Sequence, residues 1–135
     1  MKPLAGITML LGTVAICLAW CGTGAAQERS GDGFVCVPTS VAECTADGEC
    51  QRGNAQSENF PTSLKVDLKA KTIRTSDPGR HSGIDQIQRT DGTIILNGLE
   101  NGRAWVMMIQ DKSGNMSATI AGQGESFVVF GVCPG

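Results

Sequence analysis

His81 is the single histidine of the chain and the first candidate for chemistry. It lies in Pro78-Gly79-Arg80-His81-Ser82-Gly83, between Asp77 and Asp85. A histidine near a hydroxyl and a carboxylate could act as the base of a Ser-His-Asp hydrolase. That chemistry needs a serine on a sharp turn such as Gly-x-Ser-x-Gly, whereas here His81 holds the central position. We therefore predict a polar surface loop over 76–83 and keep a hydrolase using His81 as an alternative.

Trp105 is the candidate for binding a small ligand. It stands in the apolar segment Ala104-Trp105-Val106-Met107-Met108-Ile109, where an indole could form one wall of a pocket. Ordinary core packing explains the same position, and we favour it. The chain has no tyrosine, which argues against an aromatic platform for sugars.

No cofactor or metal site is predicted from the motifs. Neither Gly-x-Gly-x-x-Gly nor Gly-x-x-x-x-Gly-Lys occurs, so phosphate-binding loops are not expected. Asp111-Lys112-Ser113-Gly114-Asn115 resembles the start of a calcium loop but lacks the distal glutamate. The cysteines are spaced too widely for a typical zinc site.

The N-terminal segment 1–26 predicts a signal peptide. Lys2 precedes an apolar run over 4–20, and small residues lead to a cleavage site between Ala26 and Gln27. The run has 17 residues, fewer than the roughly 20 that a membrane-spanning helix needs. Lipidation at Cys21 is a minor option, because Trp20 stands where lipoprotein signals carry a small residue. We expect a periplasmic or secreted protein.

Charge in the remaining chain excludes some partners. Residues 27–135 keep ten of the 11 basic residues against 13 acidic ones, with no basic cluster. Nucleic acid is therefore not an expected partner. Membrane contact is expected only through the signal peptide, since no basic amphipathic segment occurs.

Four cysteines of the exported chain predict two disulfides in an oxidising compartment. The turn signal Asp47-Gly48 can bring Cys44 and Cys50 together, which leaves Cys36 to pair with Cys133. The second bridge would join the first strand to the end of the chain.

The segment 27–135 is expected to be one all-β domain. Residues 27–61 are predicted to be mostly loop with one strand at 34–37, and 62–135 an antiparallel meander. Predicted turns include Asp91-Gly92, Asn97-Gly98 and Asn101-Gly102. The segments at 104–109 and 127–130 are apolar on both faces and are the candidate central strands. Besides the strand at 34–37, strands are predicted at 64–69, 72–75, 84–89, 93–96, 116–121 and, around these two apolar segments, at 103–110 and 126–133.

About eight short strands separated by turns predict a rolled sheet or small barrel tied by disulfides. A bridge from Cys36 to Cys133 would favour closure of the sheet, because it brings the first and last strands together. A two-sheet sandwich is the alternative.

One resemblance can be drawn from Phe34-Val35-Cys36-Val37-Pro38, from Cys44 and Cys50, and from Phe130-Gly131-Val132-Cys133. Together they resemble small uncharacterised exported proteins of Gram-negative bacteria, which begin and end in a cysteine-bearing strand. The resemblance implies a periplasmic or secreted location and implies no activity.

The leading functional hypothesis is a non-enzymatic exported domain that presents loops to a protein or a small ligand, as an inhibitor would. The candidate surface combines 76–83 with 42–61. The alternative is a carrier for a small apolar ligand with a pocket near Trp105.

Overall fold

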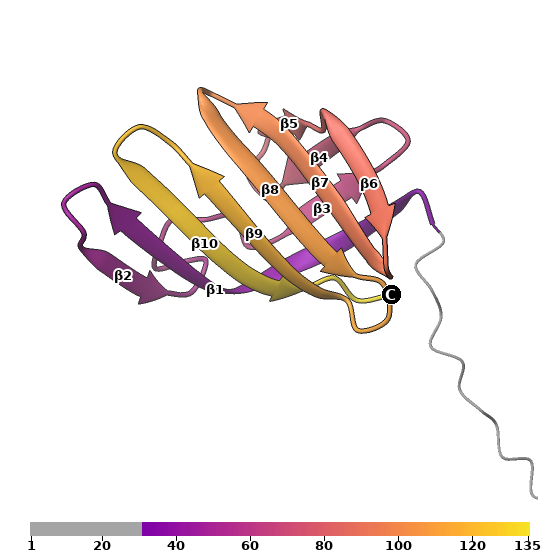
Figure 1. Ribbon diagram of the computed structural model, residues 1–135, viewed down its shortest axis with the longest axis horizontal. Helices are drawn as coiled ribbons and strands as arrows, with labels where there is room; N and C mark the ends of the chain where they lie inside the picture. The colour runs from indigo at the N-terminus through magenta and orange to yellow at the C-terminus, as the bar shows by residue number, and fades with distance from the viewer. Residues whose placement is uncertain (1–30) are drawn as a thin grey trace, which may run out of the picture.

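The computed structural model describes residues 31–135, which form ten strands and contain no helix (Figure 1). The predicted signal peptide, its cleavage after Ala26 and the option of lipidation at Cys21 lie outside these residues. Nothing helical in the described part has the length and apolarity to cross a membrane. The strands are β1 (Gly33–Thr45), β2 (Cys50–Gly53), β3 (Leu64–Asp67), β4 (Thr72–Thr75), β5 (His81–Gly83), β6 (Gln86–Thr90), β7 (Thr93–Glu100), β8 (Arg103–Gln110), β9 (Asn115–Ala121) and β10 (Glu125–Val132).

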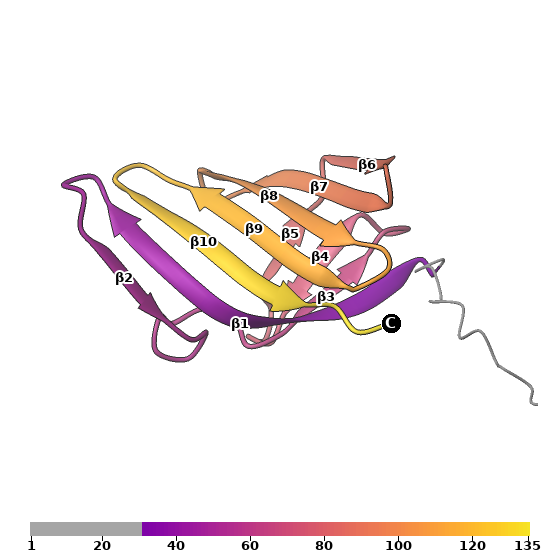
Figure 2. The same cartoon turned by 60° about the horizontal axis from the view of Figure 1, so that its bottom comes forward.

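All strands join one antiparallel sheet in the order β5-β4-β3-β1-β10-β9-β8-β7-β6, and β2 also pairs with β1. The sheet rolls so that β3, β4 and β5 fold back behind β7 and β8, as both views show (Figure 2). The Asp85 amide donates to the Asn97 carbonyl at 2.8 Å, which ties the segment after β5 to β7. The prediction of a disulfide-tied, rolled antiparallel sheet is thus confirmed, and the sandwich is not found.

Strand β1 is the longest element and makes the roll possible. Its residues 33–36 pair with β3, whereas 37–45 pair with β10 and 41–44 also with β2. Between Pro38 and Ser40 the register with β10 shifts, which leaves Thr39 as an extra residue. Such a bulge bends a strand, and it suits Pro38, which has no amide hydrogen for the ladder. Gly131 lies opposite the bend, where any Cβ would collide with the Val37 carbonyl.

The prediction that 42–61 is loop is wrong for part of that segment. Strand β1 continues to Thr45, and β2 covers Cys50–Gly53. These residues lack a period-2 pattern because they are half-buried or exposed without alternation, and their strand state comes from pairing with β10 and across the β1–β2 hairpin. Register with partners far along the chain is invisible to local periodicity.

Two further turn or loop predictions are corrected. The pair Asn97-Gly98 lies inside β7, and residues 81–83 of the predicted surface loop form β5. The predicted turns at Asp91-Gly92 and Asn101-Gly102 do occur, and all four residues have positive φ. Asn-Gly suits a hairpin turn, but the strong pairing of β7 with β8 carries the strand through Gly98.

The core lies on the concave side of the sheet, where the buried side chains of most strands meet. The disulfide between Cys36 and Cys133 is part of this core, and both residues are fully buried. Strands β8 and β10 lie inside the sheet order, but one face of each is open to solvent. Val106, Met108 and Phe130 are 42%, 41% and 49% exposed. Apolar residues on both faces therefore do not mean burial on both faces here.

Candidate functional site

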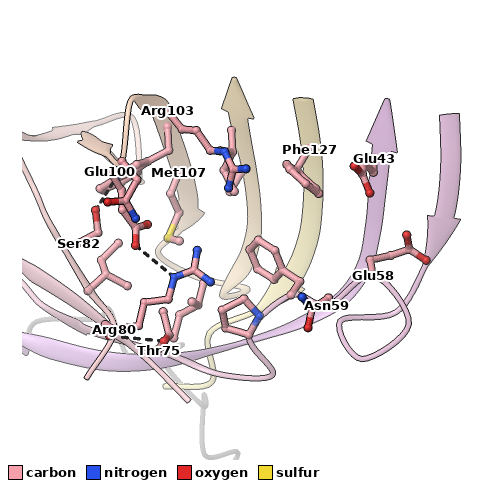
Figure 3. A pocket seen from close by; sticks show the side chains of 18 residues that line it. Glu43, Glu58, Asn59, Thr75, Arg80, Ser82, Glu100, Arg103, Met107 and Phe127 are labelled. Carbon is pink, nitrogen blue, oxygen red and sulfur yellow. Dashed lines mark hydrogen bonds and ion pairs between the residues drawn. The ribbon is translucent and has the colours of Figure 1, made fainter. Parts of the chain in front are cut away.

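A cavity of about 370 Å³ lies on the concave side of the rolled sheet (Figure 3). Its size falls within the range of pockets that enclose small organic molecules. Arg80 and Arg103 line it and are partly exposed, so the cavity reaches the surface. Its apolar wall comes from five strands and includes Leu64, Ile73, Trp105, Met107, Ala118, Ile120 and Phe127.

The alternation of β8 and β9 builds the wall. Trp105 and Met107 point inward while Val106 and Met108 between them are exposed, as the period of a strand requires. In the ladder with β9, Met107 lies opposite Ala118. A residue as small as alanine leaves space in front of the sheet that a larger side chain would fill.

Trp105 both packs in the core and lines the cavity. Its side chain is almost buried, and its Nε1–H donates to Ser82 Oγ at 3.0 Å. This hydrogen bond links β8 to β5 across the rolled sheet. Opposite Trp105 in the β7 ladder stands Gly98, where a Cβ would lie 2.6 Å from the indole ring. The ring is therefore positioned by a hydrogen bond on one side and by a missing side chain on the other.

Two ion pairs border the cavity. Arg80 Nε lies 3.2 Å from Glu100 Oε1, and Arg103 pairs with Glu125. The guanidinium of Arg103 also lies over the Phe127 ring, 6.0 Å from its centroid. Both arginines are about two-fifths exposed, so solvent screens the pairs and they add little to stability. Each pair does place a carboxylate beside the charge of its arginine.

The two segments proposed as an interaction surface meet at this cavity. Phe60 and Pro61 line it from the loop after β2, and Arg80 lines it from the loop before β5. In the loop after β2, the Phe60 amide donates to the carbonyl of the buried Ala55 at 2.7 Å. The surface that the sequence indicated therefore includes the walls of the cavity.

His81 and Ser82 are not brought together as catalytic partners. They are consecutive residues of β5, so their side chains point to opposite faces of the sheet. Ser82 is buried against the cavity, whereas His81 is exposed beside Arg74. Asp77 lies 3.9 Å from Arg80 rather than beside the imidazole. Within residues 31–135, no three His, Cys, Asp or Glu side chains are grouped to hold a metal ion.

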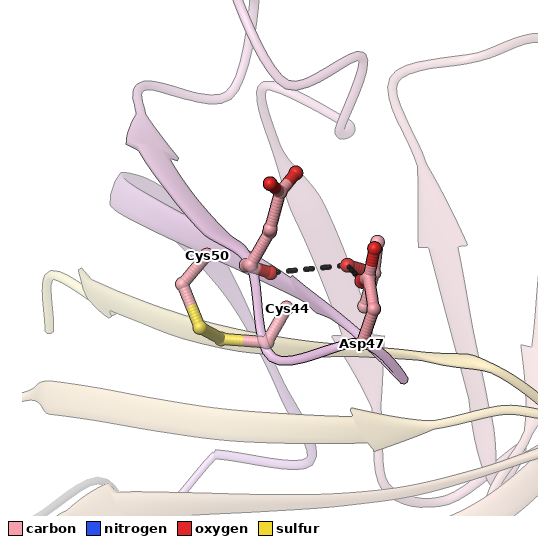
Figure 4. Close-up of a disulfide and its surroundings, with 5 residues drawn as sticks. Cys44, Asp47 and Cys50 are labelled. Atoms are coloured by element: carbon pink, nitrogen blue, oxygen red, sulfur yellow. Dashed lines mark hydrogen bonds between the residues drawn. A yellow bond between two sulfur atoms is a disulfide. The ribbon is translucent and has the colours of Figure 1, made fainter.

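The disulfides link the same cysteines that the sequence predicts, Cys36 with Cys133 and Cys44 with Cys50. Two disulfides indicate an oxidising compartment, outside the cytoplasm or in the periplasm. The second bridge closes the tip of the β1–β2 hairpin (Figure 4).

Asp47 lies in the turn that this second bridge closes. A hydrogen bond from the Thr45 hydroxyl, together with backbone amide donors, holds the pKa of Asp47 below its ordinary value of 3.8. These donors stabilise the charged carboxylate more than the neutral acid.

No protein-family model, curated protein or solved structure matches the chain.

Several residues of the site are not found by sequence reasoning. Ser82 was not identified because it lies in a segment predicted to be a loop, and Gly98 was not identified because it lies in a predicted turn. Arg103 and Phe127 come together from β8 and β10, which only the sheet order places in one site. One available signal was the spacing of Trp105, Met107 and Ile109, three buried side chains at every second position.

Proposed function

We propose that the protein is an exported, non-enzymatic binding protein that takes a small ligand with a mainly apolar body into the cavity beside Trp105. The observation that supports this proposal is the cavity itself, a space of about 370 Å³ on the concave side of the sheet, half of whose lining residues are apolar and include the buried Leu64, Trp105 and Met107. Apolar surface that stays hydrated in a concave site gains free energy when a ligand covers it. Export is supported by the two disulfides and by the signal-like segment 1–26.

A protein partner is the second candidate. Val106 and Met108 of β8 and Phe130 of β10 are exposed on the convex face, and Phe130 and Met108 both pair with Ser117 of β9. Exposed apolar groups that cluster on a sheet face are typical of interaction surfaces. Such a partner would use the opposite side of the sheet from the cavity.

The cavity proposal is tested by filling the space. Ala118→Leu places three more carbon atoms in the cavity, and Ala104→Leu makes the same change on the exposed face of β8. We expect the neutral dye N-phenyl-1-naphthylamine to bind the unsubstituted protein and Ala104→Leu with one site. Ala118→Leu should weaken its binding by about tenfold or more, while thermal unfolding shows that the variant still folds.

Saturable binding that Ala118→Leu leaves unchanged would place the dye elsewhere and overturn the proposal. So would the lack of saturable binding by this dye and by a panel of apolar probes of similar size.

A further inference from the structure

Ser82 differs from the other polar residues that line the cavity because it is buried. The described chain buries two polar residues, Ser82 and Thr93, and of these two Ser82 lines the cavity. It lies on β5 at the end of the cavity near Arg80 and Glu100 (Figure 3). A buried polar side chain in an apolar wall is costly unless its hydrogen bonds are made.

The hydrogen bonds of Ser82 are only partly made by the protein. A hydroxyl has one donor and two acceptor lone pairs. Trp105 Nε1–H uses one lone pair at 3.0 Å. The nearest protein acceptor for the hydroxyl hydrogen is the Gly83 carbonyl at 3.5 Å, beyond the usual 2.5–3.0 Å for such a bond. The donor of Ser82 is thus available to a group inside the cavity, and the indole fixes the oxygen in place.

The charged groups at this end of the cavity are already matched. The two charged residues that line the cavity beside Ser82, Arg80 and Glu100, pair with each other at 3.2 Å, and Asp77, which lies 3.9 Å from Arg80, does not line the cavity. A charged group brought there would lose its hydration without gaining an unpaired counter-ion. A neutral oxygen needs only one hydrogen-bond donor.

We infer that the ligand is an uncharged, mainly apolar molecule with an oxygen acceptor, such as a ketone or an ester, and that the Ser82 hydroxyl donates to this oxygen. The inference rests on the proposed function and adds to it the polarity of the ligand and the residue that recognises it. The apolar body would lie along Met107, Ala118 and Ile120, away from Ser82. Ser82 is then a residue that determines specificity, held in place by Trp105.

The test uses two uncharged probes of nearly equal shape and a third probe that is charged. 2-Acetylnaphthalene carries a carbonyl oxygen where 2-isopropenylnaphthalene carries a methylene, and 2-naphthoate adds a negative charge. Each is titrated against protein loaded with N-phenyl-1-naphthylamine, and its affinity is taken from displacement of the dye. We expect the ketone to bind about three- to tenfold more tightly than the hydrocarbon, the value of one neutral hydrogen bond, and more tightly than the naphthoate.

The variants Ser82→Ala and Ser82→Cys should abolish the preference for the ketone while keeping the affinity for the hydrocarbon. Ser82→Cys retains the size of the side chain and offers only a weak donor, so it guards against a folding defect in Ser82→Ala.

Equal binding of ketone and hydrocarbon, or a preference that survives in both variants, would overturn the inference and leave the cavity proposal standing. Tighter binding of the naphthoate than of the ketone would overturn the inference that the ligand is uncharged. Lack of binding by the dye and by all probes would overturn the proposed function itself.

Discussion

Trp105 and Gly98 lie opposite each other in the β7–β8 ladder, and the indole ring occupies the space that a side chain at Gly98 would fill. A glycine inside a strand usually weakens it, because it packs nothing and loses more conformational entropy on folding. Here the glycine allows the largest side chain of the wall to contact the backbone of the neighbouring strand at Gly98. The position of Trp105 in the cavity thus depends on the residue across the ladder.

Replacing Gly98 by alanine should displace the indole. The new Cβ would collide with the Gly83 carbonyl and come within 2.6 Å of the ring, so the ring or the backbone must shift. We expect a loss of about 1–3 kcal/mol in the free energy of unfolding, as for overpacked cores, and a red shift of tryptophan emission.

The control for this change is Gly83→Ala on the adjoining strand. No heavy atom lies within 4 Å of a Cβ built at Gly83, and its backbone needs no positive φ. Chemical denaturation and emission spectra, with Trp105→Phe as the fluorescence blank, compare the two. Equal effects of the two substitutions would contradict the role given to Gly98.

The pattern of residues predicts those parts of the fold in which a strand and its partner are neighbours in sequence. The hairpin from β8 to β9 has clear alternation and the expected bounds, within one residue. The second half of β1 was missed because it pairs with β10, whose residues lie about 90 positions further along the chain. Strand β2 was missed although its partner β1 is close in sequence, because Cys50–Gly53 is exposed or half-buried and so has no hydrophobic alternation. A pocket beside Trp105 was one of the predicted alternatives, but the residues that other strands add to its wall could not be named, because the roll of the sheet brings them there. Trp105 could be named from its segment, but Ser82 reaches it through the roll of the sheet.

Acid should weaken the β1–β2 hairpin through Asp47. The pKa of Asp47 is lower in the folded protein than its ordinary value of 3.8, chiefly because the Thr45 hydroxyl donates to the carboxylate. The stabilisation is therefore fully present above the unfolded pKa and is lost as the pH falls through the folded pKa. An NMR titration of the Asp47 carboxyl carbon should give a midpoint below 3.8, and Thr45→Val should raise it.

Thr119→Val is the matched control for Thr45→Val. Thr119 is an exposed threonine of β9 and makes no hydrogen bond to Asp47. The Asp47 midpoint should stay where it is in that variant. A midpoint in the unsubstituted protein at or above 3.8 would contradict the hydrogen bond as the cause.

His81 should be dispensable. Its side chain is exposed on the face of β5 opposite Ser82, and the described protein gives it no hydrogen-bond partner. His81→Ala should change the free energy of unfolding by no more than about 0.5 kcal/mol, as at ordinary surface sites. Its affinity for the naphthyl dye should match that of the unsubstituted protein. A hydrolytic activity that disappears in this variant alone would support the hydrolase instead.

The two disulfides should differ in their contribution to stability because they close loops of different length. Cys36 and Cys133 are 97 residues apart, and Cys44 and Cys50 are six apart. In the chain-entropy description, a longer loop restricts the unfolded chain more, by about 4–5 kcal/mol for the first bridge and about 2 kcal/mol for the second. The double variant Cys36→Ala/Cys133→Ala should lose the larger amount, measured by urea denaturation, and Cys44→Ala/Cys50→Ala the smaller. Cys36 and Cys133 are also buried where β1 changes partners, so their removal leaves a void at the bend of the sheet. Equal losses of unfolding free energy in the two double variants would contradict the predicted dependence on loop length. A larger loss from removing the Cys44–Cys50 bridge would also contradict it.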